Sequence, residues 1–299
     1  MLRNQVSRLF CAGLAAAGLT TAATPGFAQE EVDMSPNQGA ISFSAGADVV
    51  TQYIFRGVEQ EDSGFIFQPY VELGTNIFET EDMSLDFYGG NWNSWHSEET
   101  GTDADGTSSP EWWYEADLYA FLSLSAFEWW TFEAGYVGYF YPSGTADDIH
   151  EFNVSVAFDD SWLWEEYAGF EFALNPYFLL AAEFDDRGGS NDTYGEFGVE
   201  ASYTVIESQD YPVTLSVPVT VGLSINDYYL DENGDDETFG YVSVGLMAGT
   251  DLSFIPAEYG AWSASAGYTA FFLNDDIDGI NDTQEDLEHV GSLSVSMSY

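Results

Sequence analysis

The chain has 299 residues, of which 52 are Asp or Glu and only 4 are Lys or Arg, so its formal net charge is −48. A chain this acidic repels phosphate groups, and binding to nucleic acid is therefore not expected. Aromatic residues make up 17% of the sequence. This content is far higher than disordered segments carry, so we expect the chain to fold and to bury many of these rings.

The first residues have the pattern of a secretory signal peptide. Arg3 and Arg8 precede an apolar run over 9–19, and small residues follow as far as Ala28. The apolar run is too short to span a bilayer, which favours a cleaved signal over residues 1–28 and export through the Sec-type pathway. Residues 29–40 are then expected to form a short periplasmic segment. Because Cys11 lies within the signal, the mature chain would have no thiol for disulfides or zinc.

The first predicted strand begins at Ile41. Apolar residues occupy the odd positions from Ile41 to Phe55, while polar residues occupy most of the even positions up to Arg56. Alternation with a period of two indicates a strand with one apolar and one polar face. The run is much longer than the five or six residues of an average soluble strand, as the tilted spans of a membrane barrel are.

Eleven further segments repeat this alternation. They fall at about 65–77, 83–88, 112–123, 129–141, 149–158, 169–184, 193–206, 212–227, 238–250, 259–273 and 287–299. We therefore predict an all-β fold: a transmembrane, antiparallel, up-and-down β-barrel of about twelve strands over residues 41–299. An even number of strands is typical of bacterial single-chain barrels.

The connections between these segments alternate in length, which supports the same fold. Long acidic segments at 94–110, 185–192, 227–237 and 274–286 alternate with short ones such as 79–82, 125–128 and 207–210. Outer-membrane barrels pair long extracellular loops with short periplasmic turns. The segment 159–168 is too long for a periplasmic turn, and we expect it to form a small interfacial cap or a helical turn.

The last predicted strand ends on an aromatic residue. Leu293, Val295, Met297 and Tyr299 alternate with serines. This pattern resembles the C-terminal signal by which barrel assembly machinery recognises outer-membrane proteins, so that machinery is an expected partner, together with outer-membrane lipid. The alternative is an ordinary amphipathic strand that happens to end the chain.

Two motifs resemble those of a known family. The segment from Val49 to Gln60 contains Tyr53-x-x-Arg56-Gly57 followed by Gln60, and a second segment, 138–142, reads Gly-Tyr-Phe-Tyr-Pro ahead of Glu151. Both are similar to motifs of the TorF-type porins, small bacterial barrels, over about 41–206. The resemblance implies a barrel in the bacterial outer membrane. This chain differs in its longer acidic loops and in Thr51-Gln52 where Ser-Asp is usual, so the resemblance implies the fold and the location and not a shared solute preference.

The alternation also predicts which charged side chains point into the barrel. If the apolar faces meet lipid, ten carboxylates and one arginine line the lumen: Arg56, Glu72, Asp86, Glu115, Asp117, Glu133, Glu151, Glu171, Glu183, Glu196 and Glu200. Such a lumen would concentrate cations and disfavour anions. We expect Arg56 to lie at the outer end of the first strand, among carboxylates such as Glu72 and Asp86. The alternative places it at the loop edge, beside the lipid headgroups.

Two functions fit these features. The first is a porin for passive passage of small solutes with a preference for cations. The second is a non-conducting structural or surface-interaction barrel with acidic loops that bind divalent ions. Barrels of eight strands are filled by side chains and those of sixteen or more enclose open channels, so twelve strands leave the choice open. A group of large aromatic residues is predicted to point inward and could plug the lumen: Tyr88, Trp92, Trp113, Trp129 and Tyr139.

Enzymatic activity is not expected. The three histidines, His96, His150 and His289, have no recognisable serine partner in the sequence, and no G-x-S-x-G motif occurs. Paired carboxylates of the glycosidase type remain an alternative role for the inward acids, but lining of a lumen is favoured.

One loop has the spacing of a calcium site. Residues 274–285 place oxygen-bearing side chains at five positions that fit a calcium-binding loop: Asn274, Asp276, Asp278, Asp282 and Glu285. The first of them is Asn in place of Asp, and no flanking helices are expected. Calcium in an extracellular loop is therefore one interpretation, and a solvated acidic hairpin loop is the other. No other cofactor is predicted.

Overall fold

A computed structural model gives the structure of the chain and describes residues 40–98, 100, 112–144, 146–169, 172–184, 192–208, 211–277 and 286–299. The predicted signal peptide and nearly all of the segment 29–40 lie outside these ranges, so both stay predictions.

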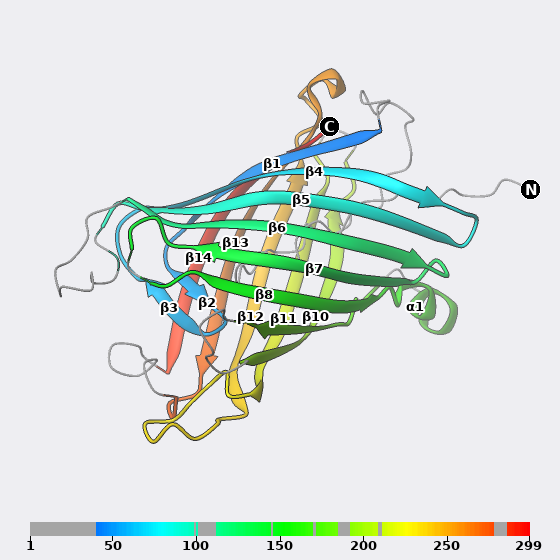
Figure 1. The fold of residues 1–299 in the computed structure, drawn as a ribbon. Coiled ribbons are helices and arrows are strands. Elements are labelled where there is room, and N and C mark those ends of the chain that lie inside the picture. Colours follow the sequence, from blue (N-terminus) through cyan, green and yellow to red (C-terminus); the bar gives the residue numbers. More distant parts are fainter. Residues whose placement is uncertain are drawn as a thin grey trace, which may run out of the picture.

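Over these residues, twelve antiparallel strands form a closed barrel in which each strand pairs with its neighbours along the chain and β14 pairs with β1 (Figure 1). The barrel strands are β1 (Ile41–Val50), β4 (Ile66–Glu79), β5 (Met83–His96), β6 (Trp113–Ala126), β7 (Trp130–Phe140), β8 (Ile149–Phe158), β9 (Tyr177–Glu183), β10 (Thr193–Ile206), β11 (Val213–Asn226), β12 (Phe239–Asp251), β13 (Ala261–Leu273) and β14 (Leu287–Ser298). The predicted fold class and strand number are confirmed.

The two ends of the barrel differ in their connections. One end carries the long acidic connections and the first loop, which joins β1 to β4, and we call this end the long-loop rim. The other end, the short-turn rim, carries tight turns, the helix α1 (Ser161–Ala168) and the short 3-10 helix η1 (Ala257–Tyr259). In Figure 1 α1 lies at the end of the barrel opposite to the small hairpin of β2 (Tyr53–Phe55) and β3 (Val58–Glu61).

The barrel closes at a seam between its first and last strands. Seven residues of β1, from Ser44 to Val50, pair with β14. Beyond them, the backbone nitrogen of Phe43 donates to the carbonyl oxygen of Tyr299 at 2.8 Å, and the nitrogen of Tyr299 donates to the oxygen of Phe43 at 2.7 Å. The final aromatic residue is therefore part of the seam.

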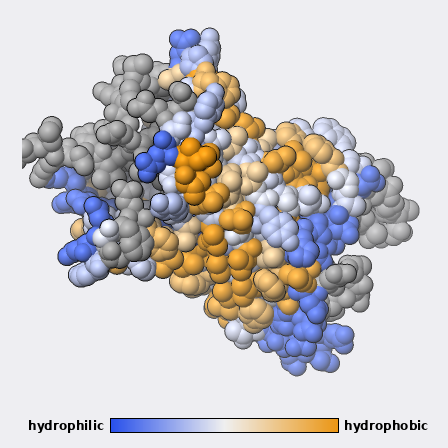
Figure 2. Space-filling model, turned by 180° about the vertical axis from the view of Figure 1, so that it is seen from behind, coloured by the Kyte–Doolittle hydropathy of each residue, from blue (hydrophilic) through white to orange (hydrophobic). Residues whose placement is uncertain are grey.

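The outer surface of the barrel is apolar across its middle. Large side chains that stay more than half exposed there include Leu73, Leu118, Leu246 and Leu293. Figure 2 shows hydrophobic residues gathered across the middle of the visible face, with hydrophilic residues at both ends. A continuous apolar surface of this kind is unfavourable in water and indicates contact with an apolar phase. Among the described residues, no helix is both long and apolar enough to cross a membrane.

The first predicted strand is shorter than expected. β1 ends at Val50, and the chain turns inward to form the β2–β3 hairpin, which is a sheet of its own. Arg56 and Gly57 at its tip have φ values of 49° and 83°. Two successive residues of positive φ are what a type I′ hairpin turn requires, so the alternation from 41 to 56 spans two elements. Tyr53, predicted to face lipid, is instead buried inside the barrel.

The predicted strand over 169–184 begins later, at Tyr177. Ahead of it, α1 forms the helical turn that the sequence predicted for this connection. Asp160 accepts hydrogen bonds from the backbone nitrogens of Leu174 and Asn175 and from the indole of Trp164. These bonds tie the helix to the approach of β9, where the carbonyl oxygens of Leu174 and Pro176 still accept single backbone hydrogen bonds from Glu200 and Phe158 before the regular strand begins at Tyr177.

A β-bulge changes the facing of one predicted strand. The register slips between Ser94 and Trp95, so that Trp95 pairs with Trp113 and Ser94 pairs with Glu115. The extra residue, Tyr114, turns inward with Glu115. Trp113, which strict alternation would place in the lumen, is exposed on the outer face, because a bulge shifts the alternation by one residue.

Candidate functional site

The β2–β3 hairpin crosses the inside of the barrel from one wall to the other. Tyr53 packs in a buried aromatic cluster with residues of β4 to β8, and its ring centroid lies 5.6 Å from that of Trp92. The next residue, Ile54, belongs to a second buried cluster formed by β9 to β14 and the 227–238 connection. Alternate residues of one strand face opposite ways. The hairpin therefore fills the outer part of the lumen with contacts on both sides.

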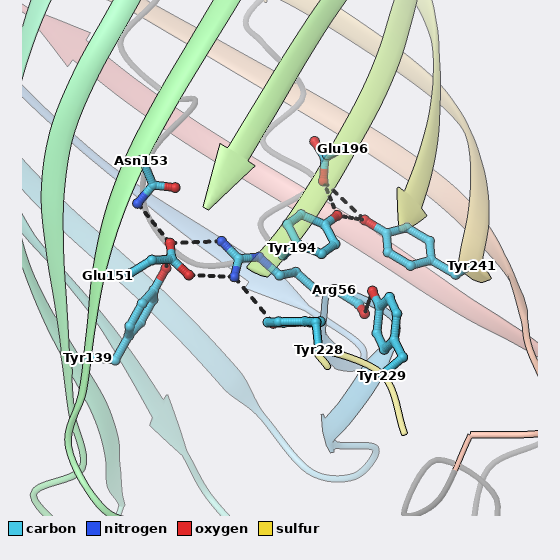
Figure 3. Close-up of polar contacts among 9 residues, drawn as sticks. All are labelled: Arg56, Tyr139, Glu151, Asn153, Tyr194, Glu196, Tyr228, Tyr229 and Tyr241. Carbon is cyan, nitrogen blue, oxygen red and sulfur yellow. Dashed lines mark hydrogen bonds and ion pairs between the residues drawn. The ribbon is translucent and has the colours of Figure 1, made fainter. Parts of the chain in front are cut away.

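Arg56 at the tip of the hairpin forms the main polar contact with the barrel (Figure 3). Its two terminal nitrogens donate to the two carboxylate oxygens of Glu151 on β8 at 2.6 and 2.9 Å. Only 5% of the surface of Arg56 and none of Glu151 is exposed. The predicted partners Glu72 and Asp86 are wrong, because the hairpin carries Arg56 to the wall that begins at β8.

Aromatic rings and further hydrogen-bond donors surround this ion pair. Glu151 also accepts hydrogen bonds from the hydroxyl of Tyr139 at 3.2 Å and the amide of Asn153 at 2.7 Å. The guanidinium carbon of Arg56 lies 4.3 Å from the ring centroid of Tyr194 and 5.5 Å from that of Tyr228. Figure 3 draws both rings beside the guanidinium. We call Tyr139, Glu151, Asn153, Tyr194 and Tyr228 the arginine seat.

A second inward segment supports the seat. Residues 227–238 connect β11 to β12, and two consecutive tyrosines of this connection turn into the lumen. Tyr228 accepts a hydrogen bond from Arg56, and the hydroxyl of Tyr229 donates to the backbone oxygen of Arg56 at 2.8 Å. The hairpin tip is thus held by side-chain and backbone contacts together.

Tyrosine hydroxyls donate to several of the inward carboxylates. The pairs are Tyr53 with Glu115 at 2.9 Å, Tyr88 with Glu133 at 3.1 Å, Tyr119 with Glu72 at 3.1 Å and Tyr177 with Glu196 at 2.6 Å. A neutral donor lowers the cost of burying a carboxylate without removing its charge. The alternation predicted the inward carboxylates but not their tyrosine partners. The predicted inward positions of Tyr88 and Tyr139 were the one sign in the sequence that tyrosines lie close to these carboxylates.

The structure brings most of the predicted lumen residues to the inner wall. Six are buried: Glu72, Asp86, Glu115, Asp117, Glu133 and Glu151. Glu183, Glu196 and Glu200 on β9 and β10 are half-buried, and Glu171 lies outside the described residues. Whether these groups line a conducting pore stays a prediction.

The inner wall formed by β13, β14 and β1 is different in character, and we call it the serine wall. Asp48 on β1 lies opposite Ser294 on one side and Gln68 on the other, and Gln68 is buried inside the barrel. Directly opposite residues share one face of a sheet, so Asp48 and Ser294 face inward. Both remain half-buried. Small hydroxyl side chains and the carboxylate of Asp48 therefore keep contact with solvent along this wall.

Strand β3 of the hairpin carries two carboxylates whose pKa values shift in opposite directions. Burial and the nearby acids Asp62 and Glu288 raise the pKa of Glu59 to about 7. Burial would also raise the pKa of Glu61, but hydrogen bonds from Thr100 and Ser63 outweigh it and lower that pKa. Both groups lie in the folded-in loop and not in the barrel strands.

His96 has a serine neighbour, which the sequence did not predict. Ser94 Oγ lies 2.8 Å from Nε2 of His96, whose Nδ1 lies 2.6 Å from Thr100 Oγ1. Thr100 in turn donates to Glu61 on the hairpin. A hydrolase needs a serine that substrate can reach, whereas Ser94 is completely buried. We therefore assign this chain of contacts a structural role that connects β5 to the hairpin.

The predicted calcium loop is described only at its start. The side chain of Asn274 accepts from the backbone of Asp276 and donates to the carbonyl oxygen of Phe239 at 2.8 Å. Asp278, Asp282 and Glu285 lie outside the described residues. Within the described part of the chain, no group of three or more His, Cys, Asp or Glu residues could hold a metal ion, so calcium binding stays a prediction.

Comparison with known proteins gives similar folds at low identity. No protein-family model and no curated protein matches the chain, so membership of the TorF-type family stays a prediction. An outer membrane channel from Pseudomonas putida F1 matches with a TM-score of 0.46 and 10% identity over 91% of this chain and 100% of that chain. The beta domain of the Bordetella autotransporter BrkA matches with a TM-score of 0.45 and 8% identity over 88% and 99%. The NanC porin matches with a TM-score of 0.39 and 11% identity over 86% and 99%.

Proposed function

We propose that this chain is a bacterial outer-membrane barrel that forms a narrow, cation-preferring channel for small solutes. The closed sheet leaves no unpaired strand edge, and the apolar middle of its outer surface suits a bilayer. In this arrangement the long-loop rim faces the outside of the cell and the short-turn rim faces the periplasm.

The charge of the inner wall is the observation that carries the cation preference. Nine of the predicted inward carboxylates lie on described inner-wall strands, while Arg56 is the only fixed cation among the described residues. Glu151 already neutralises that arginine in a two-bonded ion pair. An excess of fixed negative charge in a narrow lumen attracts cations and repels anions.

The serine wall is the proposed path from the short-turn rim up to the hairpin. The aromatic contacts of the hairpin fill the side formed by β4 to β8, where Tyr88 and Trp92 are almost completely buried. Toward the short-turn rim, by contrast, the inner side chains of β13, β14 and β1 are small and half-buried, as at Ser44, Ser265 and Ser294. Toward the long-loop rim, Phe271 and Val290 of the same wall are buried against the hairpin. Near the outer end of this wall, Gln52 donates to Glu288 at 2.9 Å. We infer that this contact marks the narrow point of the path.

A specific observation favours the alternative function as well. The hairpin joins two buried clusters across the lumen, which is what a structural barrel without conduction would need. A closed lumen of this kind would leave the acidic loops as the functional surface.

Reversal potentials in a salt gradient distinguish these functions. We expect purified, refolded protein in a planar bilayer to show small currents with cation preference in potassium chloride at neutral pH. An Asp48→Asn variant should lower that preference, whereas Glu232→Gln in an exposed loop should leave it nearly unchanged. Absence of current through well-folded protein would favour the structural barrel, and anion preference would overturn the proposed lumen.

A further inference from the structure

The arginine seat is built almost entirely without the hairpin that occupies it. Glu151 and Asn153 come from β8, Tyr139 from β7 and Tyr194 from β10, while Tyr228 comes from the 227–238 connection. All five are held by the barrel wall or by the second inward segment. The hairpin contributes Arg56 itself and the ring of Phe55, which lies 4.9 Å from the guanidinium carbon.

The chemistry of the seat matches a guanidinium group. A carboxylate that accepts two parallel hydrogen bonds fits the planar fork of a guanidinium, as the distances of 2.6 and 2.9 Å show. Tyrosine faces beside it attract a flat, weakly hydrated cation through the charge distribution of their rings. A compact ammonium group forms no such fork and is strongly hydrated, so it fits this seat less well.

An empty seat would be unfavourable. Glu151 has no exposed surface, and its hydrogen bonds from Tyr139 and Asn153 do not neutralise its charge. A buried carboxylate without a cation destabilises a protein strongly. The seat therefore favours an occupant whenever Arg56 leaves it.

We propose that the arginine seat is a binding site for guanidinium-bearing solutes, which the first loop fills with its own Arg56. A free solute and the docked hairpin tip compete for the same two carboxylate oxygens, so occupancy by the solute displaces the hairpin from the outer part of the lumen. Any effect of this displacement on the passage of solutes rests on the proposed channel function. The binding of a solute at the seat does not depend on that function.

The test replaces the tethered group and supplies a free one. Arg56→Asn removes the guanidinium, and Asn tolerates the positive φ of this position better than most residues. The full barrel is refolded in detergent, and its melting temperature is recorded with increasing ethylguanidinium or, as the matched control, ethylammonium. We expect a saturable rise with ethylguanidinium in Arg56→Asn, with apparent affinity at least ~10-fold above that for ethylammonium.

Two further chains serve as controls. The native barrel should show little response at ethylguanidinium concentrations well below the millimolar effective concentration of the tethered Arg56, because the free cation then competes poorly for the seat. The Arg56→Asn, Glu151→Gln double variant should lose the response, because the carboxylate fork is absent.

Several results would overturn the site. Equal responses to the two cations, no saturable response, or a response that persists without Glu151 would each do so. If Arg56→Asn does not refold alone, the yield of folded barrel with and without ethylguanidinium becomes the measurement, and no recovery overturns the site. Current recordings separate the two proposals: binding without conduction removes only the channel, and conduction without binding removes only the site.

Discussion

Arg56 and Glu151 illustrate at the residue scale how a single contact can decide the arrangement of a loop. Both are buried, and they lie 95 residues apart in the chain. Alternation along the sequence predicted that both side chains face the lumen, and both lie inside the barrel, but Arg56 does so at the hairpin tip and not on a wall strand. The alternation could not pair them, because the partner of a loop residue depends on how the loop folds, which alternation within strands does not encode.

Breaking this ion pair on one side should destabilise the barrel. Arg56→Met leaves a buried carboxylate without its cation, and we expect it to lower the free energy of unfolding by about 3–5 kcal/mol. The double variant Arg56→Met, Glu151→Leu should lose much less, because neither charge is then left alone. Denaturant unfolding in detergent measures both, and an unchanged single variant would contradict the assigned contact.

Glu59 should make the docking of the hairpin depend on pH. Its pKa is raised from its ordinary value of 4.5 to about 7, so the folded state binds the proton more tightly than the unfolded state. Its contribution to stability is then greatest below pH 4.5 and is lost as the pH rises to about 7. Glu59→Gln should therefore stabilise the barrel at pH 8, by about 1 kcal/mol after solvent screening, but not at pH 4. If Glu59→Gln shifts the melting temperature relative to the native protein by the same amount at both pH values, the assigned role of Glu59 is contradicted.

At the scale of elements, the hairpin turn depends on glycine. Gly57 has a φ of 83°, and a Cβ atom there would lie 2.9 Å from the ring of Tyr241. Gly57→Ala should undock the hairpin tip and lower the melting temperature. Gly234→Ala is the matched control, because Gly234 has a φ of 80° with nothing within 4 Å. In both variants an alanine at positive φ costs about 1–2 kcal/mol. Equal losses of stability in the two variants would therefore show that the hairpin tip does not pack against Tyr241.

The closing seam gives a second prediction for an element. Deleting Tyr299 removes two backbone hydrogen bonds to Phe43 together with the terminal aromatic ring, and assembly into membranes should be impaired. Tyr299→Phe keeps both features and should assemble normally. Heat-modified migration on gels reports insertion, and normal insertion of the truncated chain would count against a role for this residue.

The elements also show where periodicity is informative and where it fails. Strands β10 to β14 were predicted within a few residues, because one apolar and one polar face persist along each of them. The break after Val50 was missed because the inward hairpin continues the same alternation for several residues. The bulge at Tyr114 was missed for a related reason, since an inserted residue reverses the alternation without changing the composition.

On the scale of the whole molecule, an acidic lumen and an apolar outer surface both follow from alternation over twelve strands. Composition alone predicted the acidity but not its distribution. The structure separates an inner surface filled by aromatic rings and the hairpin from the small side chains that β13, β14 and β1 carry toward the short-turn rim, and this division could not be predicted. It arises from contacts between loops and walls that are distant in sequence.

Single-channel current through the native barrel and through Arg56→Asn, recorded in the same bilayer and salt, tests the account most directly. The proposed channel is narrowed by a hairpin that the arginine seat holds in place. We predict a small cation-selective current for the native protein and a several-fold larger one, still cation-selective, for the variant. Equal currents from the two folded proteins would contradict the claim that the hairpin controls the lumen.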